Sequence, residues 1–575
     1  QGEFMEKDFK FGTLEYIRPD FDSMERKAKE YALKIKNAAS YEEAKNAYLE
    51  FDREECKLSD MATIASIRHT IDTGDGFYDK ENEYINEKFP EYNAAYMEFA
   101  NAMYDGKFKS DFIKEFGNAM FSDLELRRKS YSEKNIPLLQ KEARLCDEYE
   151  KIIASASIPF DGKNLNLYGI MSYFESPDRK TRHDAYKAYS GFYEANVNRF
   201  EEIWDELIKN RNEQAANLGF ENYIPLGYMR QGRTDYDEKD VASFREQVRE
   251  ELVPFCAKLY KAQAERTGVE KVMAYDEKFI FEDGNAKPVG DDDFLIEKAR
   301  EMYRDMSKET GEFIDFMLDH ELLDVKNRPR KASTGYMTSI NTLKAPFVFS
   351  CFNQTTADVD VLTHEMGHAF AGYEAMRNQP ISAYYSESTD IAEIHSMSME
   401  QFAYPYAEKF FGDKADKFRF AHLQEALTFV PFGVAVDEYQ HIVYAHPELT
   451  PEERTAEWKK LEEKYMPWRD YGDIDFFAKG GWWYHKIHIF LYPFYYINYT
   501  LTTMGAMEFK KKMNEDKVSA WKDYLNLCKV GGSLGYKDTL KYANLSIPFE
   551  KGSVKKAVSY AEDILMSQIE NMKRG

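Results

Sequence analysis

Apolar residues recur with helical spacing over most of this chain, among many Glu, Lys and Ala residues. Such spacing gathers the apolar side chains on one face of a helix, and the residues between them favour helix formation. The clearest segments of this kind are residues 22–39, 41–58, 135–154 and 239–266. The pattern predicts a predominantly α protein.

Two short segments interrupt the helical pattern. Residues 155–168 contain the apolar runs SIPF and LNLY on either side of Asp161-Gly162, a dipeptide favoured in tight hairpin turns. Residues 345–352, APFVFSCF, are a second extended candidate. This strand could pair with an extended peptide if its edge were exposed, or it could be buried. We therefore expect a small β element in the helical fold.

The chain has 575 residues, more than one ordinary core, yet no repeat or long linker divides it. We place a boundary near residue 176, between an amino-terminal helical region, 5–176, and a larger region, 177–575. Residues 1–4 precede Met5 and are interpreted as an expression remnant. Residues 268–294 lack a regular pattern and predict a surface excursion. The glycine-rich residues 531–535 predict either a connector between helices or a loop that could close over a bound ligand.

Net charge and cysteine content indicate which partners and which cellular compartment suit this chain. A formal net charge of -24 argues against nucleic acid, because phosphate binding needs an excess of Lys and Arg. The five cysteines are far apart and form no CxxC pair, which suits a reducing compartment. No stretch resembles a signal peptide or approaches the roughly 20 apolar residues that span a bilayer. These features predict a cytoplasmic protein without nucleic-acid or membrane partners.

The chemically informative motif is His364-Glu365-Met366-Gly367-His368, which reads HExxH within a segment of helical periodicity, 358–376. On a helix, residues four positions apart project from the same face, so His364 and His368 could both reach one metal ion. Glu365 would lie beside that ion, where its carboxylate could take a proton from a bound water. The motif therefore predicts a hydrolytic metal site.

A third ligand is expected from a second helix. After a turn-like stretch at 377–382, a helix beginning near 386–389 carries Asp390, Glu393 and Glu400, and an antiparallel return can bring a carboxylate back to the motif. Glu393 lies 25 positions beyond His368. This spacing resembles the thimet oligopeptidase and oligoendopeptidase F family. The resemblance implies that His364, His368 and Glu393 hold one zinc ion and that Glu365 is the general base.

Three neighbouring residues have alternative interpretations. Glu400 could orient a ligating imidazole, since a ligating His normally donates its other N–H to a partner, or it could be an exposed helix acid. The same two readings apply to Asp390. His395 is two positions from Glu393 and so faces another side of the helix, which favours a structural role over a ligand role.

A late aromatic segment, 481–499, reads GWWYHKIHIFLYPFYYINY. On a helix continuing through Pro493, Tyr492, Tyr496 and Tyr499 would share one face, with Tyr495 close to it. Such tyrosines often pack in a core. The family carries a His followed by spaced tyrosines that bind substrate and donate to the oxyanion. The resemblance therefore implies these roles for His488, Tyr496 and Tyr499, with Tyr495 as the substitute for either tyrosine. Tyr492 is a further candidate for substrate contact.

Together, the motif and the resemblance imply a large, two-part, zincin-type metallopeptidase with a deep channel that admits short peptides. The expected activity is hydrolysis of internal peptide bonds by a metal-activated water. One alternative is a dipeptidyl carboxypeptidase of the angiotensin-converting-enzyme type, which also shows HEMGH and a downstream Glu. Another is a peptide-binding scaffold that keeps the metal for stability, although structural zinc sites have four protein ligands. The sequence predicts no oligomeric state.

Overall fold

The computed structural model describes residues 9–332, 334–353 and 355–574. The predicted remnant, 1–4, and the Ser333 and Gln354 positions lie outside the described residues. The chain forms two compact units, each built from three segments. Unit 1 comprises Gln1–Glu125, Lys287–Ala415 and Lys512–Leu545, and unit 2 comprises Leu126–Ala286, Asp416–Lys511 and Ser546–Gly575. This grouping differs from two continuous regions, and the boundary near residue 176 stays a prediction.

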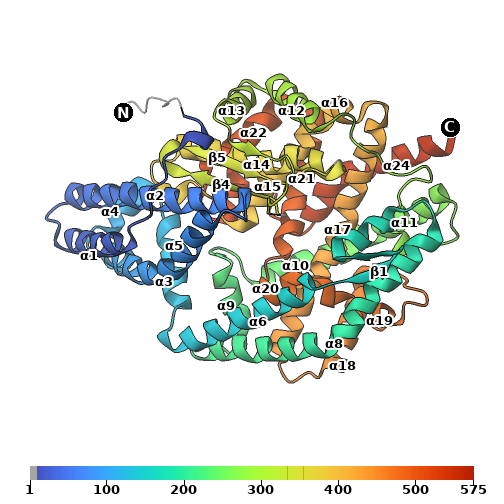
Figure 1. The fold of residues 1–575 in the computed structure, drawn as a ribbon, viewed down its shortest axis with the longest axis horizontal. Coiled ribbons are helices and arrows are strands. Elements are labelled where there is room, and N and C mark those ends of the chain that lie inside the picture. Colours follow the sequence, from blue (N-terminus) through green and yellow to red (C-terminus); the bar gives the residue numbers. More distant parts are fainter. Residues whose placement is uncertain (1–8, 333, 354, 575) are drawn as a thin grey trace. The chain divides into compact units, whose positions relative to one another are not determined.

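Unit 1 is mainly helical, and its amino-terminal helices α1 to α3 lie side by side (Figure 1). Their shared core contains many aromatic side chains. The side chains of Ser40 and Asp75 accept backbone N–H groups at the starts of α2 and α3, which satisfies donors that have no partner within the helix. The helices that lie wholly or mostly in this unit are α1 (Phe21–Asn37), α2 (Tyr41–Ile71), α3 (Gly76–Tyr104), α4 (Lys109–Phe116), α5 (Ala119–Ser130), α12 (Asp292–Met306), α13 (Lys308–Asp319), α14 (Thr356–Asn378), α15 (Thr389–Ala403), α16 (Glu408–Phe411), α22 (Lys517–Val530) and α23 (Tyr536–Tyr542).

A three-stranded sheet of unit 1 lies against α14. Its order is β3 (Leu323–Asp324), β5 (Ala345–Phe349) and β4 (Tyr336–Ile340), with β5 parallel to β3 and antiparallel to β4. The extended segment predicted at 345–352 is therefore confirmed, but β5 is the central strand and all five of its residues are buried. Its suggested exposed edge is wrong, because β3 and β4 occupy both of its sides.

Unit 2 is also mainly helical, and the segment predicted at 239–266 forms α10 and α11 joined by a π-helical turn, Val248–Leu252. The predicted surface excursion, 268–294, is partly wrong, because Phe279, Ile280 and Phe281 are buried. The helices that lie wholly or mostly in this unit are α6 (Ile136–Ala154), α7 (Leu167–Met171), α8 (Arg179–Ala216), α9 (Tyr223–Arg230), α10 (Glu238–Gln247), α11 (Val253–Thr267), α17 (Ala415–Ala445), α18 (Pro451–Tyr465), α19 (Asp475–Ala478), α20 (Ile487–Leu491), α21 (Ile497–Glu515) and α24 (Ser553–Arg574).

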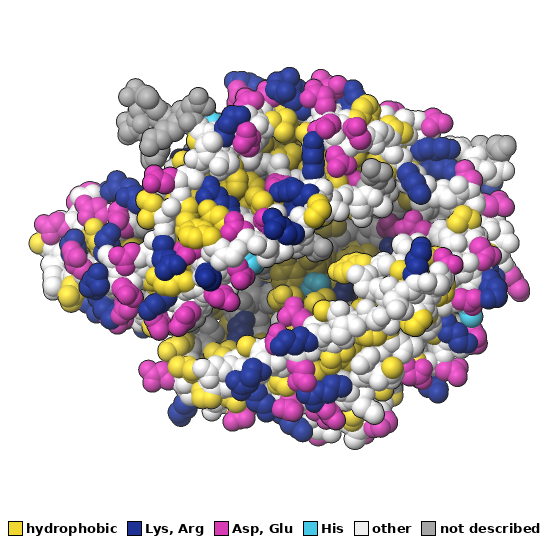
Figure 2. Space-filling view, viewed as in Figure 1, with side chains coloured by type: hydrophobic (Ala, Val, Ile, Leu, Met, Phe, Trp, Pro, Cys, Tyr) yellow, Lys and Arg dark blue, Asp and Glu magenta, His cyan; other side chains and the backbone are white. Residues whose placement is uncertain are grey.

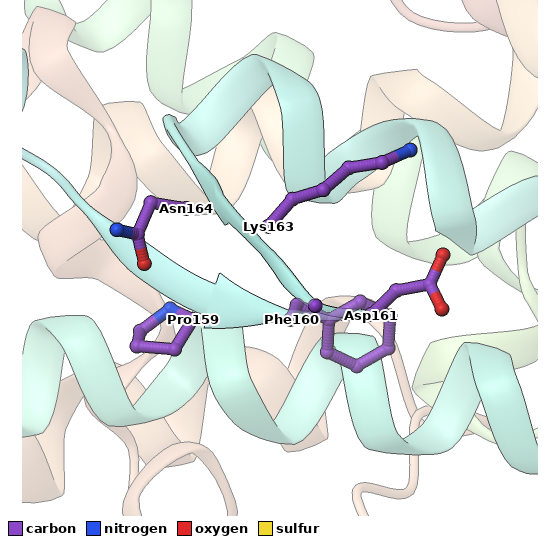
Figure 3. A pocket seen from close by; sticks show the side chains of 6 residues that line it. Pro159, Phe160, Asp161, Lys163 and Asn164 are labelled. Atoms are coloured by element: carbon purple, nitrogen blue, oxygen red, sulfur yellow. The ribbon is translucent and has the colours of Figure 1, made fainter.

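The predicted hairpin is present in unit 2. Strand β1 (Ile158–Phe160) pairs antiparallel with β2 (Lys163–Leu165), and the turn residues Asp161 and Gly162 have φ values of 50° and 70°. Asp and Gly tolerate this left-handed region, which explains why the dipeptide forms the turn. Figure 3 shows the hairpin and the shallow pocket that residues 159–164 line. The prediction of a predominantly α fold with a small β element is confirmed.

Acidic and basic side chains are interspersed on the face shown in Figure 2. Many of them form ion pairs one helical turn apart, such as Glu25 with Lys29 on α1 and Glu30 with Lys34 on the same helix. This agrees with solvated helix faces as the ordinary role of most charges. Among the helices of the described ranges, none combines the length and the apolar content that crossing a bilayer requires.

Candidate metal centre

The HExxH motif lies in the middle of α14, as its periodicity predicts. Between Leu362 and Phe370, only His364, Glu365 and His368 keep partial exposure, while the other residues are buried. The buried side of α14 packs against the sheet, α15 and α22. The helix thus presents the three chemically active side chains of the motif on its accessible side.

The second helix, α15, supplies the predicted carboxylate. Helix α14 ends at Asn378, two residues before Pro380, since the residue preceding a proline disfavours the helical conformation. The connection is fixed to α2 by Asp52, whose carboxylate accepts the Ser382 hydroxyl at 2.5 Å. From there α15 returns along α14 and carries Glu393 to the two histidines.

Glu393 faces both imidazoles with one oxygen. Its Oε2 lies 3.2 Å from His364 Nε2 and 3.5 Å from His368 Nε2, and the three ligand atoms are within 4.8 Å of one another. In a tetrahedral site with bonds of about 2.05 Å, neighbouring ligand atoms are roughly 3.3 Å apart. The two measured spacings from Glu393 fit that value, so the donor set suits an ion of this size.

Glu400 contacts the ring nitrogen of His364 that is opposite the one facing Glu393. Its Oε1 lies 2.5 Å from His364 Nδ1, which leaves Nε2 directed at Glu393. Burial acts to lower the pKa of His364, but Glu393 and Glu400 outweigh it and raise that pKa well above its ordinary value. Burial acts to raise the pKa of Glu393, but the two imidazoles lower it well below its usual range. Because a ligating imidazole must be neutral, a metal ion bound here would compete with protonation of His364.

The remaining acidic and imidazole candidates, Asp390 and His395, are buried side chains of α15. Asp390 is buried in the first turn, where it accepts the Ser388 hydroxyl, so it is not an exposed helix acid. His395 is fully buried, and its Nδ1 lies 3.2 Å from Glu387 Oε1. The structure brings His395 to Glu387 and not to the candidate ligand cluster, as its position predicted. Glu387 was missed by sequence reasoning, because an acid before a helix start carries no distinctive signal.

Glu365 differs from its neighbours in the motif. Among the described residues it makes no hydrogen bond or ion pair, and it is partly exposed. A carboxylate without a partner keeps its lone pairs available for a water or a substrate group. This is the condition that a general base requires.

The late aromatic segment lies in unit 2 and does not form one helix. A 3-10 turn (Gly481–His485) leads into α20, and the chain breaks at Tyr492 before α21 begins at Ile497. The expected continuous helix is therefore wrong. Pro493 lacks the N–H that a helix needs, and Phe494 has a φ of 63°, which a right-handed helix cannot contain.

Three side chains from two distant segments stabilise this break in the helix. The Gln231 amide donates to Pro493 O at 2.9 Å, and the Arg233 guanidinium donates to Phe494 O. The backbone N–H of Phe494 donates to Gln440 Oε1 at 2.9 Å. These contacts satisfy the backbone groups that leave the helical pattern, and they fix the direction of the tyrosines that follow.

The predicted substrate residues cluster around His488. Its ring centroid lies 4.8 Å from that of Tyr496, 5.9 Å from those of Tyr492 and Tyr495, and 6.0 Å from that of Tyr499. Tyr496 is 6% exposed, whereas Tyr492 is 51% exposed. Burial and the nearby Lys486 charge lower the pKa of His488 to about 3, so the imidazole is neutral. The structure thus brings all five together within unit 2, and their roles stay predictions.

A helical protein with an HExxH helix and a returning glutamate is the class that this fold and site define. Sequence comparison agrees: the Peptidase M3 N-terminal domain matches residues 11–131, and Peptidase family M3 matches residues 172–291 and 309–558. The chain belongs to peptidase family M3. It is therefore a peptidase that acts on peptide substrates, and the predicted resemblance is confirmed.

Relatives are similar over most of their length. An oligoendopeptidase F homologue of Borreliella burgdorferi is 21% identical in an alignment of 491 positions that covers 79% of this chain and 79% of the relative. One from Lactococcus lactis subsp. lactis is 23% identical over 536 residues, covering 83% of this chain and 82% of the relative. The solved structure of PZ peptidase A has 42% identity and a TM-score of 0.89, covering 97% of this chain and 99% of that one.

Proposed function

We propose that this protein is a zinc-dependent oligoendopeptidase that hydrolyses internal bonds of short peptides. The observation that carries the proposal is the spacing of 3.2 and 3.5 Å between Glu393 Oε2 and the two imidazole nitrogens. Within the described part of the chain, Glu365 of the same motif makes no hydrogen bond or ion pair. Three protein ligands leave a fourth position for water or substrate, which is typical of catalytic zinc sites and not of structural ones. The names of the oligoendopeptidase F relatives support the endopeptidase activity.

In this proposal, His364, His368 and Glu393 hold one zinc ion, and Glu400 orients the His364 ring. Zinc bound there would polarise a carbonyl oxygen and lower the pKa of a water molecule. Glu365 takes the proton of the attacking water through its free carboxylate and passes it to the leaving amine. Glu393 contributes one negative charge to the ligand set, and the two histidines must be neutral to ligate.

We extend the proposal to unit 2, where His488, Tyr496 and Tyr499 would bind substrate and donate to the oxyanion. Lys486 donates to the Tyr496 hydroxyl at 2.9 Å, and an ammonium group cannot accept a hydrogen bond. The proton of Tyr496 is therefore free to be donated to another group. Replacing Tyr496 or Tyr499 by Phe is expected to lower kcat about 100-fold or more, as the loss of one oxyanion donor does elsewhere.

We also propose a cytoplasmic location, which all five cysteines support because each is free, as in a reducing compartment.

The decisive experiment uses a quenched, end-blocked peptide of about ten residues, long enough to contain internal bonds for a metal-activated water to attack. Wild type, Glu365→Gln and the exposed-site control Glu312→Gln are compared with and without a chelator and added zinc. We expect internal cleavage that needs zinc and falls by about 100-fold or more in Glu365→Gln, with Glu312→Gln unchanged.

Other outcomes identify the alternatives. Release of carboxy-terminal dipeptides from unblocked peptides, with none from blocked ones, would identify the dipeptidyl carboxypeptidase instead. Zinc binding without any hydrolysis would favour the scaffold. Full turnover by Glu365→Gln would refute its role as general base.

A further inference from the structure

Gly367, inside the HExxH motif, lies at a close contact between α14 and α15. A β carbon at this position would lie 2.7 Å from Ser396 Cα, 3.0 Å from Met399 Cβ and 3.1 Å from His395 O. All three atoms belong to α15, and none is the end of a flexible side chain. Nothing at this contact can rotate away to make room.

The backbone conformation of Gly367 does not require glycine. It lies within a regular α-helix, and its φ is not positive. Inside a helix, glycine is about 1 kcal/mol less favourable than alanine. Local propensity therefore favours alanine at this position, and the close approach of α15 is the feature that only glycine permits.

The same contact connects directly to the third ligand. Ser396 lies one turn after Glu393 on α15, and its hydroxyl donates to Glu393 Oε2 at 3.2 Å. His364 and His368 flank Gly367 on α14, three positions before it and one after it. A change in the separation of the helices at Gly367 would therefore move Glu393 relative to both imidazoles.

The movement that a β carbon would require is large compared with the tolerance of a metal site. Ordinary contact between carbon atoms begins at about 3.5 Å, so the 2.7 Å approach would require α15 to move by roughly 0.8 Å. Metal–ligand distances in working sites stay within about 0.2 Å of their ideal values. A displacement several times that tolerance would detach Glu393 or distort the site.

We propose that Gly367 is a positioning residue whose missing side chain sets the separation of α14 and α15 at the value that lets Glu393 share a metal ion with His364 and His368. The inference rests on the proposed metal site and goes beyond it by giving the fourth residue of the motif a function.

The test measures zinc affinity by competition with a chromophoric chelator, independently of hydrolysis. Gly367→Ala is expected to bind zinc at least about tenfold more weakly than wild type, the size of effect typical when the groups around a ligand are disturbed. Gly372→Ala is the matched control on the same helix, because its β carbon would meet only Met337 and Ser339 side-chain atoms at 3.7 Å. This control should keep wild-type affinity.

A double-mutant cycle with Glu393→Ala separates positioning from general damage. If Gly367 acts through Glu393, the double variant should bind zinc no more weakly than Glu393→Ala alone. In the cobalt-substituted protein, Gly367→Ala should give the altered visible spectrum of Glu393→Ala, whereas Gly372→Ala should give that of wild type. Additive losses of affinity, or a wild-type spectrum, would overturn the proposal.

Two further variants keep the test decisive if Gly367→Ala folds poorly. Met399→Ile branches at the β carbon that lies against Gly367, so a smaller loss of affinity in the same direction is expected. Gly106→Ala places a β carbon 2.7 Å from Ala102 O at the end of α3 and strains unit 1 at a helix that carries none of the three candidate ligands. An equal loss of zinc affinity in Gly106→Ala would show a general effect and refute the inference. If wild type bound no zinc, the proposed function would fail instead.

Discussion

The contact between Glu400 and His364 is expected to strengthen metal binding. Glu400 Oε1 lies 2.5 Å from His364 Nδ1, while the opposite ring nitrogen faces Glu393 at 3.2 Å. The carboxylate fixes both the tautomer and the ring orientation. Partners of this kind are typically worth 10- to 100-fold in metal affinity, or about 1.4 to 2.7 kcal/mol.

Two substitutions separate the effect of the Glu400 charge from the effect of its hydrogen-bond acceptor. Glu400→Gln keeps a carbonyl oxygen that can accept the Nδ1 proton but removes the charge, so we expect zinc to bind roughly tenfold more weakly. Glu400→Ala removes the acceptor as well, and the loss should approach about 100-fold. Glu312 is an exposed acid on α13, so the control Glu312→Gln should leave the zinc affinity unchanged.

The assay is zinc competition against a chromophoric chelator, with circular dichroism to confirm that each variant is folded. Wild-type affinity in Glu400→Ala would refute the reasoning, because the ring would then be held without the carboxylate. A loss as large as that of Glu393→Ala would also refute it, since it would make Glu400 a ligand and not an orienting partner.

Three further predictions concern stability. The Asp60 carboxylate accepts the backbone N–H groups of Asn341 and Thr342 at the turn between β4 and β5. Asp60→Ala should therefore lower the free energy of unfolding in urea by about 1–3 kcal/mol. An unchanged free energy of unfolding would mean that water replaces the carboxylate. Gly531→Ala should lower the Tm more than Gly552→Ala, because both have positive φ but only Gly531 lacks space for a β carbon; equal shifts would contradict this. Burial lowers the pKa of Lys486 from 10.5 to about 8, so the unfolded chain binds more protons between these values and stability should rise with pH there. The rise in wild type relative to Lys486→Met should reach about 3 kcal/mol in urea titrations at fixed pH, and parallel curves would refute it.

Local patterns predicted much of the fold and the main site. The spacing of His364 and His368 is a property of any α-helix, so their shared face follows from the sequence alone. The Asp161-Gly162 turn is likewise local, since it depends on which residues tolerate positive φ. The resemblance pointed to Glu393, which the structure brings to the two histidines.

Predictions failed where distant segments decide the structure. The break at Pro493 and Phe494 is held by Gln231, Arg233 and Gln440, and no local pattern shows those partners. Phe279 is buried although its surroundings look like a surface loop, because the Gln263 amide on α11 donates to the carbonyl groups of residues 276, 277 and 279.

The sequence by itself determined the helices, the hairpin turn and the residue types of the metal site, because these depend on periodicity and backbone preferences over a few residues. Only the tertiary structure decided that β5 lies between two strands, that Glu400 reaches His364, and that Gly367 permits the close approach of α15. The physical reason is that distances between elements are set by packing between side chains far apart in the chain. A spacing of tenths of an ångström at a metal site therefore depends on contacts that no local pattern contains.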